Sequence, residues 1–189
     1  IDGQENFLLE PGDAVVVLER NLARAAELIT SFKQLAVDQS SDQRRRFGLD
    51  ELVRSVLLAL SPTLRRAQVQ VDTDLDPDLT LDSLPGPLSQ VLENLLTNAV
   101  LHAFGGQPGG RIDIHAGADG PEHVLLTVRD HGEGMSEAVR QKAFDPFFTT
   151  RLGKGGSGLG LHIVYSLVTG PLGGRIDLDS APGQGCTFG

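Results

Sequence analysis

The sequence contains a single cysteine, Cys186, so it cannot form a disulfide within the chain, which fits a reducing compartment. It also lacks any apolar run near the roughly 20 residues that a membrane helix needs, so no spanning segment is predicted. Residues 1–5 have no basic group and no initiator methionine. This excludes a signal peptide and predicts an internal fragment of a longer protein.

Basic side chains are few, with 16 Lys and Arg against 25 Asp and Glu, for a net charge of −9. Nucleic-acid binding through phosphates needs a basic surface, so it is excluded as a general function. Any phosphate ligand has to be held locally, by backbone N–H groups, a metal or a few basic side chains. The 40% of hydrophobic residues in 189 predicts one globular domain with an appendage.

Residues 12–39 carry apolar side chains at alternating spacings of three and four: Val15, Leu18, Leu22, Ala25, Ile29, Phe32 and Ala36. This heptad pattern predicts a long helix that needs a partner helix. We expect dimerisation or a neighbouring helix upstream, with packing on its own domain as the alternative. The polar stretch 39–46 ends in three arginines and predicts a solvated hinge. It divides the chain into residues 1–43 and 44–189.

The second part alternates helical and strand patterns without regular βαβ spacing. We expect helices over residues 49–66, 90–103, 136–143 and 159–169, strands over 68–72, 111–116, 124–130, 175–179 and from 186, and an acidic connection over 74–84. The strands 111–116 and 124–130 are predicted to form a hairpin. The fold class is therefore α+β, a two-layer sandwich with helices on one face of a mixed sheet.

The helix 90–103 carries a polar stripe. Asn94, Asn98 and His102 follow one another at spacings of four, so they share one face, beside the carboxylate of Glu93. An asparagine carbonyl can ligate magnesium that already carries phosphate and water oxygens. The alternative is an ordinary solvated helix face.

Two glycine clusters follow. Asp130 ends a strand and precedes Gly132 and Gly134, an arrangement that can receive a flat ligand whose exocyclic amine donates to the carboxylate. Residues 153–161 are glycine-rich and lead into a helix, which favours an anion site over a mobile linker. Between them, residues 144–151 carry three phenylalanines and are typical of a lid, although a small satellite core is compatible with the same pattern.

In this order the segments resemble the ATP-binding domain of bacterial sensor histidine kinases, in the wider family shared with gyrase and heat-shock chaperone ATPases. Residues 94–99 resemble its asparagine box, 130–135 its first glycine box, 144–148 its phenylalanine box and 156–161 its second glycine box. The resemblance runs from about residue 49 to the end. Residues 12–39 are similar to the second helix of the dimerisation domain of these kinases, so the phosphate-accepting histidine would lie upstream.

The resemblance implies the roles of individual residues. Asn98 would ligate Mg²⁺ with the help of Asn94, Asp130 would bind the adenine amine, and Glu93 would act as a general base or remain a surface charge. The other expected ATP contacts are Gly132, Gly134, Met135 and Phe147 around the base, Thr187 closing the base pocket, His102 and Lys154 at the phosphates, and Gly156, Ser157, Gly158, Leu159, Gly160 and Leu161 along the triphosphate.

The implied function is γ-phosphoryl transfer from ATP to a histidine absent from this sequence, for relay to a response regulator receiver domain. The full-length protein would be a homodimer, this part would be cytoplasmic, and anchoring of the parent in the inner membrane stays open. One alternative is a nucleotide-sensing or dimerising module without kinase activity. Another is a strand-opening or chaperone ATPase, against which the position of the heptad helix argues.

Overall fold

The computed structural model describes residue 15 and residues 43–104, 107–151 and 156–189. The chain divides into two units, residues 1–36 and 37–189, and the second unit holds nearly all the described residues. The predicted heptad helix lies outside the described residues apart from Val15, and so does most of the segment before the predicted boundary at 43/44. None of the helices in the described ranges combines the length and apolar character needed to cross a bilayer.

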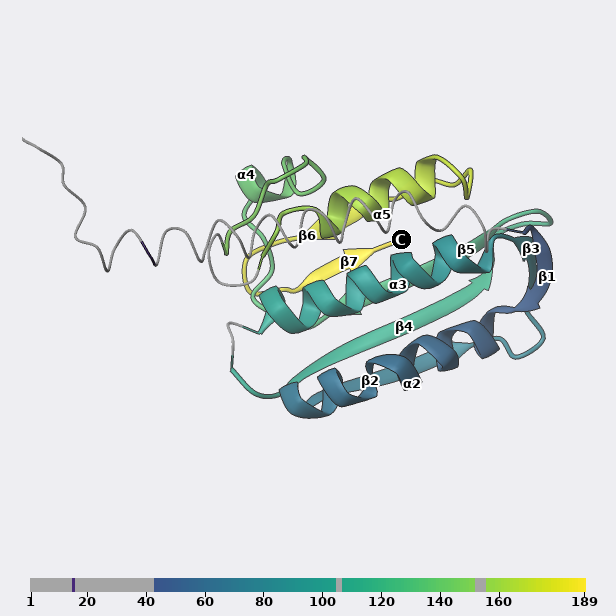
Figure 1. The fold of residues 1–189 in the computed structure, drawn as a ribbon, viewed down its shortest axis with the longest axis horizontal. Helices are drawn as coiled ribbons and strands as arrows, with labels where there is room; N and C mark the ends of the chain where they lie inside the picture. The colour runs from purple at the N-terminus through teal and green to yellow at the C-terminus, as the bar shows by residue number, and fades with distance from the viewer. Residues whose placement is uncertain (1–14, 16–42, 105–106, 152–155) are drawn as a thin grey trace, which may run out of the picture. The chain divides into compact units, whose positions relative to one another are not determined.

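A five-stranded mixed sheet forms one layer of the second unit (Figure 1). Its order is β2 (Val69–Leu75), β4 (Gly110–Ala118), β5 (Val124–Asp130), β7 (Cys186–Phe188) and β6 (Leu178–Ser180). Strand β2 runs parallel to β4, and the other neighbours are antiparallel. The predicted hairpin is β4–β5.

The helices cover one face of this sheet and complete the two-layer α+β fold that the sequence predicts (Figure 1). They are α2 (Leu49–Ala67), α3 (Pro85–Asn98) with its π-helical continuation η2 (Ala99–Ala103), and α5 (Gly160–Thr169). A short helix, α4 (Glu137–Arg140), follows β5. The acidic first turn of α2 and its basic last turn complement the helix dipole.

The core is formed between α3 and the centre of the sheet. Leu92 and Leu96 of α3, Ile112 and Ile114 of β4, and Val164 of α5 are each at most 1% exposed. Asn94 and Asn98 of α3 are only half-buried and lie off this packed face. The candidate site includes this part of the helix.

Two strands were missed by sequence reasoning. Strand β1 (Arg45–Gly48) pairs antiparallel with β3 (Thr80–Ser83), so the hinge predicted at the arginine triplet and the connection predicted over residues 74–84 are both wrong in part. Arg44 adds an exposed ion pair of 3.2 Å to Asp82. Pairing across more than 30 residues leaves no local signal in two four-residue strands.

Helix α3 begins at Pro85, where the missing N–H of proline is tolerated, so residues 85–89 open the helix predicted over 90–103. Other boundaries differ from the sequence predictions. Helix α4 has four residues in place of the eight predicted, and β6 begins at Leu178 and not at residue 175. Residues 99–103 form a π-helix and not the end of a regular α-helix. Such π-segments frequently occur at functional sites.

Candidate functional site

The carboxamide of Asn98 faces the start of α5. A Cβ added to Gly160 would lie 3.0 Å from Oδ1 of Asn98 and 3.1 Å from its Nδ2. This Nδ2 is buried and has no hydrogen-bond partner within the described ranges. A buried donor without an acceptor costs about 1–3 kcal/mol. The protein therefore keeps, at this position, a polar group that a ligand oxygen can satisfy.

The neighbours of Asn98 on α3 are arranged differently from one another. Asn94 donates its Nδ2 to the backbone oxygen of Gln90 at 2.9 Å, which leaves its Oδ1 outside that bond. Glu93 is exposed. Along α3, Glu93 is thus a surface carboxylate, Asn94 is half-buried and bonded to its own helix, and Asn98 is directed at α5.

His102 lies on η2 and also faces the glycine-rich segment. A Cβ added to Gly156 would come within 3.3 Å of Cε1 of His102. Burial lowers the pKa of His102, and the positive charge of Arg151 lowers it further. At neutral pH the imidazole is therefore uncharged and can donate one N–H. Asn98 and His102 face the same segment, in agreement with their predicted shared face, and Arg151 adds a positive charge near His102.

Asp130 ends β5 as a buried carboxylate, only 5% exposed. Its Oδ1 accepts hydrogen bonds from the backbone N–H of Gly132 at 3.0 Å and of Cys186 at 3.2 Å. Burial raises its pKa, against the opposing effect of these two donors. Neither of the two backbone N–H groups uses Oδ2. A buried carboxylate held in this way can accept a hydrogen bond from a ligand amine.

The glycines after Asp130 allow two close backbone contacts. A Cβ on Gly132 would lie 2.2 Å from the backbone oxygen of Ala103, and one on Gly134 would lie 2.0 Å from that of Ala181. The loop is thereby pressed between the end of η2 and the turn joining β6 to β7. Met135, also predicted to contact the base, is half-buried and packs against the core.

Thr187 is predicted to close the base pocket, and the register of β7 bears on that role. In the sheet, Thr187 pairs with Arg129, while Cys186 pairs with Asp130. Successive residues of a strand point to opposite faces, so Thr187 lies on the face away from Asp130. The side chain beside Asp130 is that of Cys186, the residue that directly follows Gly185. The register therefore favours Cys186 over Thr187 as the residue beside a base bound at Asp130.

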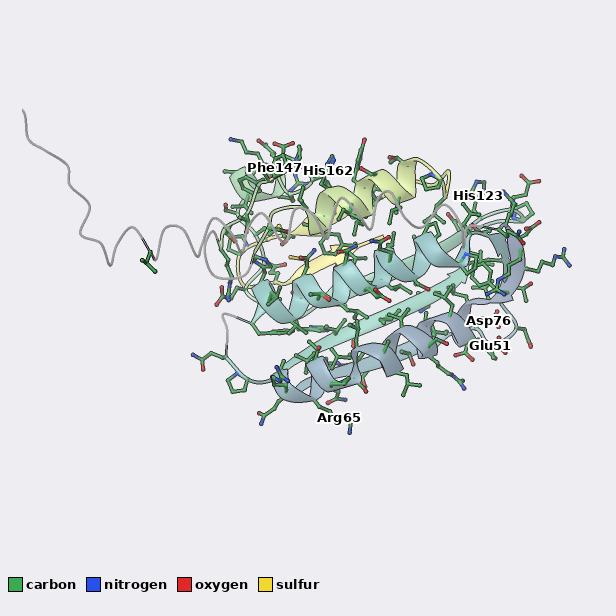
Figure 2. All side chains as sticks on the ribbon, in the orientation of Figure 1. Glu51, Arg65, Asp76, His123, Phe147 and His162 are labelled. Carbon is green, nitrogen blue, oxygen red and sulfur yellow. The ribbon has the colours of Figure 1, made fainter. Side chains whose placement is uncertain are left out.

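The glycine-rich segment contacts the phenylalanine loop. A Cβ on Gly158 would lie 2.5 Å from the backbone carbon of Phe147, a residue with positive φ. Phe147 is 51% exposed, and Figure 2 labels it at the same edge of the view as His162 of α5. The ring of Phe147 is therefore not packed in the core. Phe144 is half-buried and packs against Tyr165, with ring centroids 5.6 Å apart.

The remaining predicted phosphate-side residues line the start of α5. Leu159 is buried and Leu161 packs against the core, so both hold the helix start in place. The Oγ of Ser157 accepts a hydrogen bond from the N–H of Leu159 at 3.3 Å. Lys154 lies outside the described residues.

Two glycines in the turn between β6 and β7 allow a test of the close contact between Gly185 and the backbone of Asp130. Both Gly183 and Gly185 have positive φ, but a Cβ on Gly185 would lie 1.9 Å from the backbone oxygen of Asp130, while one on Gly183 meets nothing within 4 Å. We expect Gly183→Ala to lower the free energy of unfolding by about 1 kcal/mol and Gly185→Ala by roughly 3 kcal/mol or more. Urea denaturation measures both, and equal losses would contradict the close contact.

Cys186 is predicted to be inert towards alkylation. Burial and, to a smaller extent, the nearby Asp130 carboxylate together raise the pKa of its thiol to about 11. The thiolate is the reacting form, so labelling by iodoacetamide at pH 8 should be slow in the folded protein. Unfolding in urea should restore the rate of a free cysteine. Rapid labelling of the folded protein at pH 8 would contradict this environment.

Sequence reasoning missed three residues of this site. Arg151 and Cys186 carried only weak local signals, a basic residue in a loop and a lone cysteine. Ser180, described below, lies at a strand end with no motif around it. The Gly-x-Gly pattern of residues 183–185 was the one available signal for this part of the site, because Cys186 directly follows it.

Comparisons with known proteins agree with this geometry. Residues 84–189 match the family described as histidine kinase-, DNA gyrase B-, and HSP90-like ATPase. The sensor histidine kinase AruS of Pseudomonas aeruginosa is 40% identical over 151 residues, which cover 75% of this chain and 15% of AruS. This chain therefore spans a small part of that relative.

Two solved structures share the fold. The catalytic domain of the histidine kinase ThkA is 30% identical with a TM-score of 0.67, and the match covers 77% of this chain and 92% of that domain. Full-length ShkA in complex with AMPPNP is 25% identical with a TM-score of 0.68, over 97% of this chain and 39% of ShkA. The match to the ThkA catalytic domain extends over nearly all of that domain.

The order of the four boxes, the asparagine facing a glycine-rich helix start and the buried Asp130 all agree with these matches. The chain belongs to the histidine kinase-, DNA gyrase B- and HSP90-like ATPase family, and within it to the catalytic ATP-binding domains of sensor histidine kinases.

Proposed function

We propose that this domain binds ATP with Mg²⁺ and transfers the γ-phosphoryl group to a histidine on a helix that precedes residue 1 in the full-length protein. The observation that carries the proposal is the buried Nδ2 of Asn98 opposite Gly160, which has no hydrogen-bond partner among the residues that the structure describes. The AMPPNP complex of the related ShkA supports nucleotide binding by this fold.

Adenine would bind against Asp130. The carboxylate is buried and its Oδ1 is held by the N–H groups of Gly132 and Cys186, so its orientation is fixed before a ligand arrives. An exocyclic amine would donate to the carboxylate, and a buried acceptor left unpaired disfavours bases that lack the donor.

The triphosphate would extend from the base towards the start of α5. There the neutral His102 can donate an N–H, Arg151 supplies positive charge, and the backbone of residues 156–160 approaches closely. The carboxamide of Asn98 fits a role in which Oδ1 ligates magnesium and Nδ2 donates to a phosphate oxygen. Magnesium, when bound, neutralises charge on the transferring phosphoryl group.

Glu93 is proposed as the general base towards the incoming imidazole. It is exposed on α3 beside Asn94, so an acceptor helix can reach it from solvent. We further propose that the product is passed to a response regulator receiver domain, that the full-length protein is a homodimer, and that this domain works in the cytoplasm, where ATP is available.

Trans-phosphorylation tests the proposal. The chain is mixed with a separately produced dimerisation domain that carries the acceptor histidine of the full-length protein, together with γ-labelled ATP and Mg²⁺. We expect acid-labile label on the acceptor, and roughly 100-fold slower transfer for Glu93→Gln with unchanged ATP affinity, the size typical of a lost general base.

The two other functions give different results in the same assay. ATP binding without transfer would favour a nucleotide-sensing module. Steady release of inorganic phosphate without an acceptor would favour an ATPase of the chaperone type.

A further inference from the structure

One hydroxyl, that of Ser180 at the end of β6, joins three segments behind Asp130. Its Oγ lies 2.8 Å from the backbone nitrogen of Met135, 2.7 Å from the backbone oxygen of Gly185 and 3.3 Å from Sγ of Cys186. Met135 belongs to the loop after Asp130, Gly185 ends the β6–β7 turn, and Cys186 begins β7. The residue is half-buried.

The number of protons fixes the direction of two of these bonds. A serine hydroxyl has one proton and two acceptor positions. Because the carbonyl of Gly185 can only accept, the proton of Ser180 goes there. The N–H of Met135 takes one acceptor position. The Sγ of Cys186 lies at the other, and its proton can go to Ser180 or to the Asp130 carboxylate.

This small network lies directly behind the buried carboxylate. Cys186 donates its backbone N–H to Oδ1 of Asp130 at 3.2 Å, and Gly185 packs on the backbone oxygen of Asp130. The N–H of Gly183 reaches the backbone oxygen of Glu133 at 2.6 Å. The two loops that flank Asp130 are thus fastened to each other, and Ser180 bonds to both of them through Met135 and Gly185.

We propose that Ser180 is a positioning residue for base selectivity: by joining the loop at Met135 to the turn at Gly185 and the start of β7 at Cys186, it holds the Asp130 carboxylate where it accepts a hydrogen bond from the 6-amino group of a purine nucleotide. The inference rests on the proposed role of Asp130 as the acceptor for adenine. Ser180 does not itself contact the nucleotide.

The test compares two nucleotides on two variants. ATP and purine riboside triphosphate differ only in the 6-amino group, so the ratio of their affinities isolates the hydrogen bond to Asp130. We expect the intact protein to favour ATP, and Ser180→Ala to reduce this preference about tenfold. Affinity for purine riboside triphosphate should change less than twofold.

The matched control is Ser136→Ala. Ser136 is an exposed serine in the same loop, and as the N-cap residue of α4 its side chain makes no capping hydrogen bond. It should leave the preference unchanged. Ser180→Thr and Ser180→Val have the same shape and differ in the hydroxyl, so they repeat the comparison if Ser180→Ala does not fold. The threonine variant should retain more of the preference than the valine variant.

Three outcomes are distinguishable. Loss of preference in Ser180→Ala alone supports the inference. Equal weakening of both nucleotides, or an unchanged preference, overturns it and leaves the role of Asp130 intact. An intact protein that does not distinguish the two nucleotides overturns the role of Asp130, and the inference with it.

Discussion

Asn98→Ala is expected to weaken magnesium-dependent ATP binding roughly 100-fold, the largest effect that we predict for any single side chain on the phosphate side. The substitution removes the amide that faces Gly160 and with it the proposed magnesium ligand. It also removes the buried Nδ2 that has no partner among the described residues. Calorimetric titration with and without Mg²⁺ measures the loss.

The same substitution should not destabilise the protein without nucleotide. A buried donor with no acceptor costs free energy in the empty site, so its removal should leave the melting temperature unchanged or raise it. Gln70→Ala is the matched control. Gln70 is a carboxamide residue on β2 whose side chain bonds Asp72, and its removal should leave ATP binding intact. Magnesium-dependent binding that survives in Asn98→Ala would assign the metal to other residues.

Much of this site was predictable because its signals are local. The stripe of Asn94 and Asn98, the glycines after Asp130 and the helix start after residue 159 each depend on spacing within a short segment. Helix geometry and strand alternation convert such spacing directly into a shared face. The two-layer fold followed from the same periodicities, since each amphipathic helix needs one apolar surface to cover.

The parts that were not predictable depend on pairing between distant segments. Thr187 was assigned to the base pocket because its residue type suited the role, but the register of β7 with β5 puts Cys186 beside Asp130. The strand pair β1–β3 and the bond between Ser180 and Met135 likewise join residues that lie 32 to 45 positions apart. A one-residue shift of register reverses which side chains face the site, and residue type alone does not set that register.

Asp130→Asn is expected to abolish recognition of adenine while making the domain more stable at neutral pH. The Oδ1 of asparagine can still accept the N–H groups of Gly132 and Cys186, so the loop should keep its shape. The new NH₂ group, however, is a donor and would meet the amine donor of adenine. We expect ATP affinity to fall roughly 100-fold, because a hydrogen bond to a charged acceptor is lost and two donors oppose each other.

The gain in stability follows from the raised pKa of Asp130. The folded protein binds the proton of this carboxyl more tightly than the unfolded chain does, so the ionised form costs stability at every pH above the folded pKa. The cost disappears as the pH falls through the folded pKa towards the unfolded value of 3.8. Asparagine carries no charge and avoids the cost at all pH values.

Melting temperatures of the two proteins from pH 8 down to pH 4 measure this difference directly. The advantage of Asp130→Asn should be largest at neutral pH and should shrink as the pH falls, since every other titrating group is shared. ATP binding by the intact protein should weaken over the same acidic range as Asp130 takes up its proton. If Asp130→Asn were less stable than the intact protein at pH 7, the carboxylate would be contributing to the fold, and burial would not be the dominant influence on it. A more stable variant that no longer binds ATP would mean that the buried charge is maintained for the nucleotide at the expense of the fold.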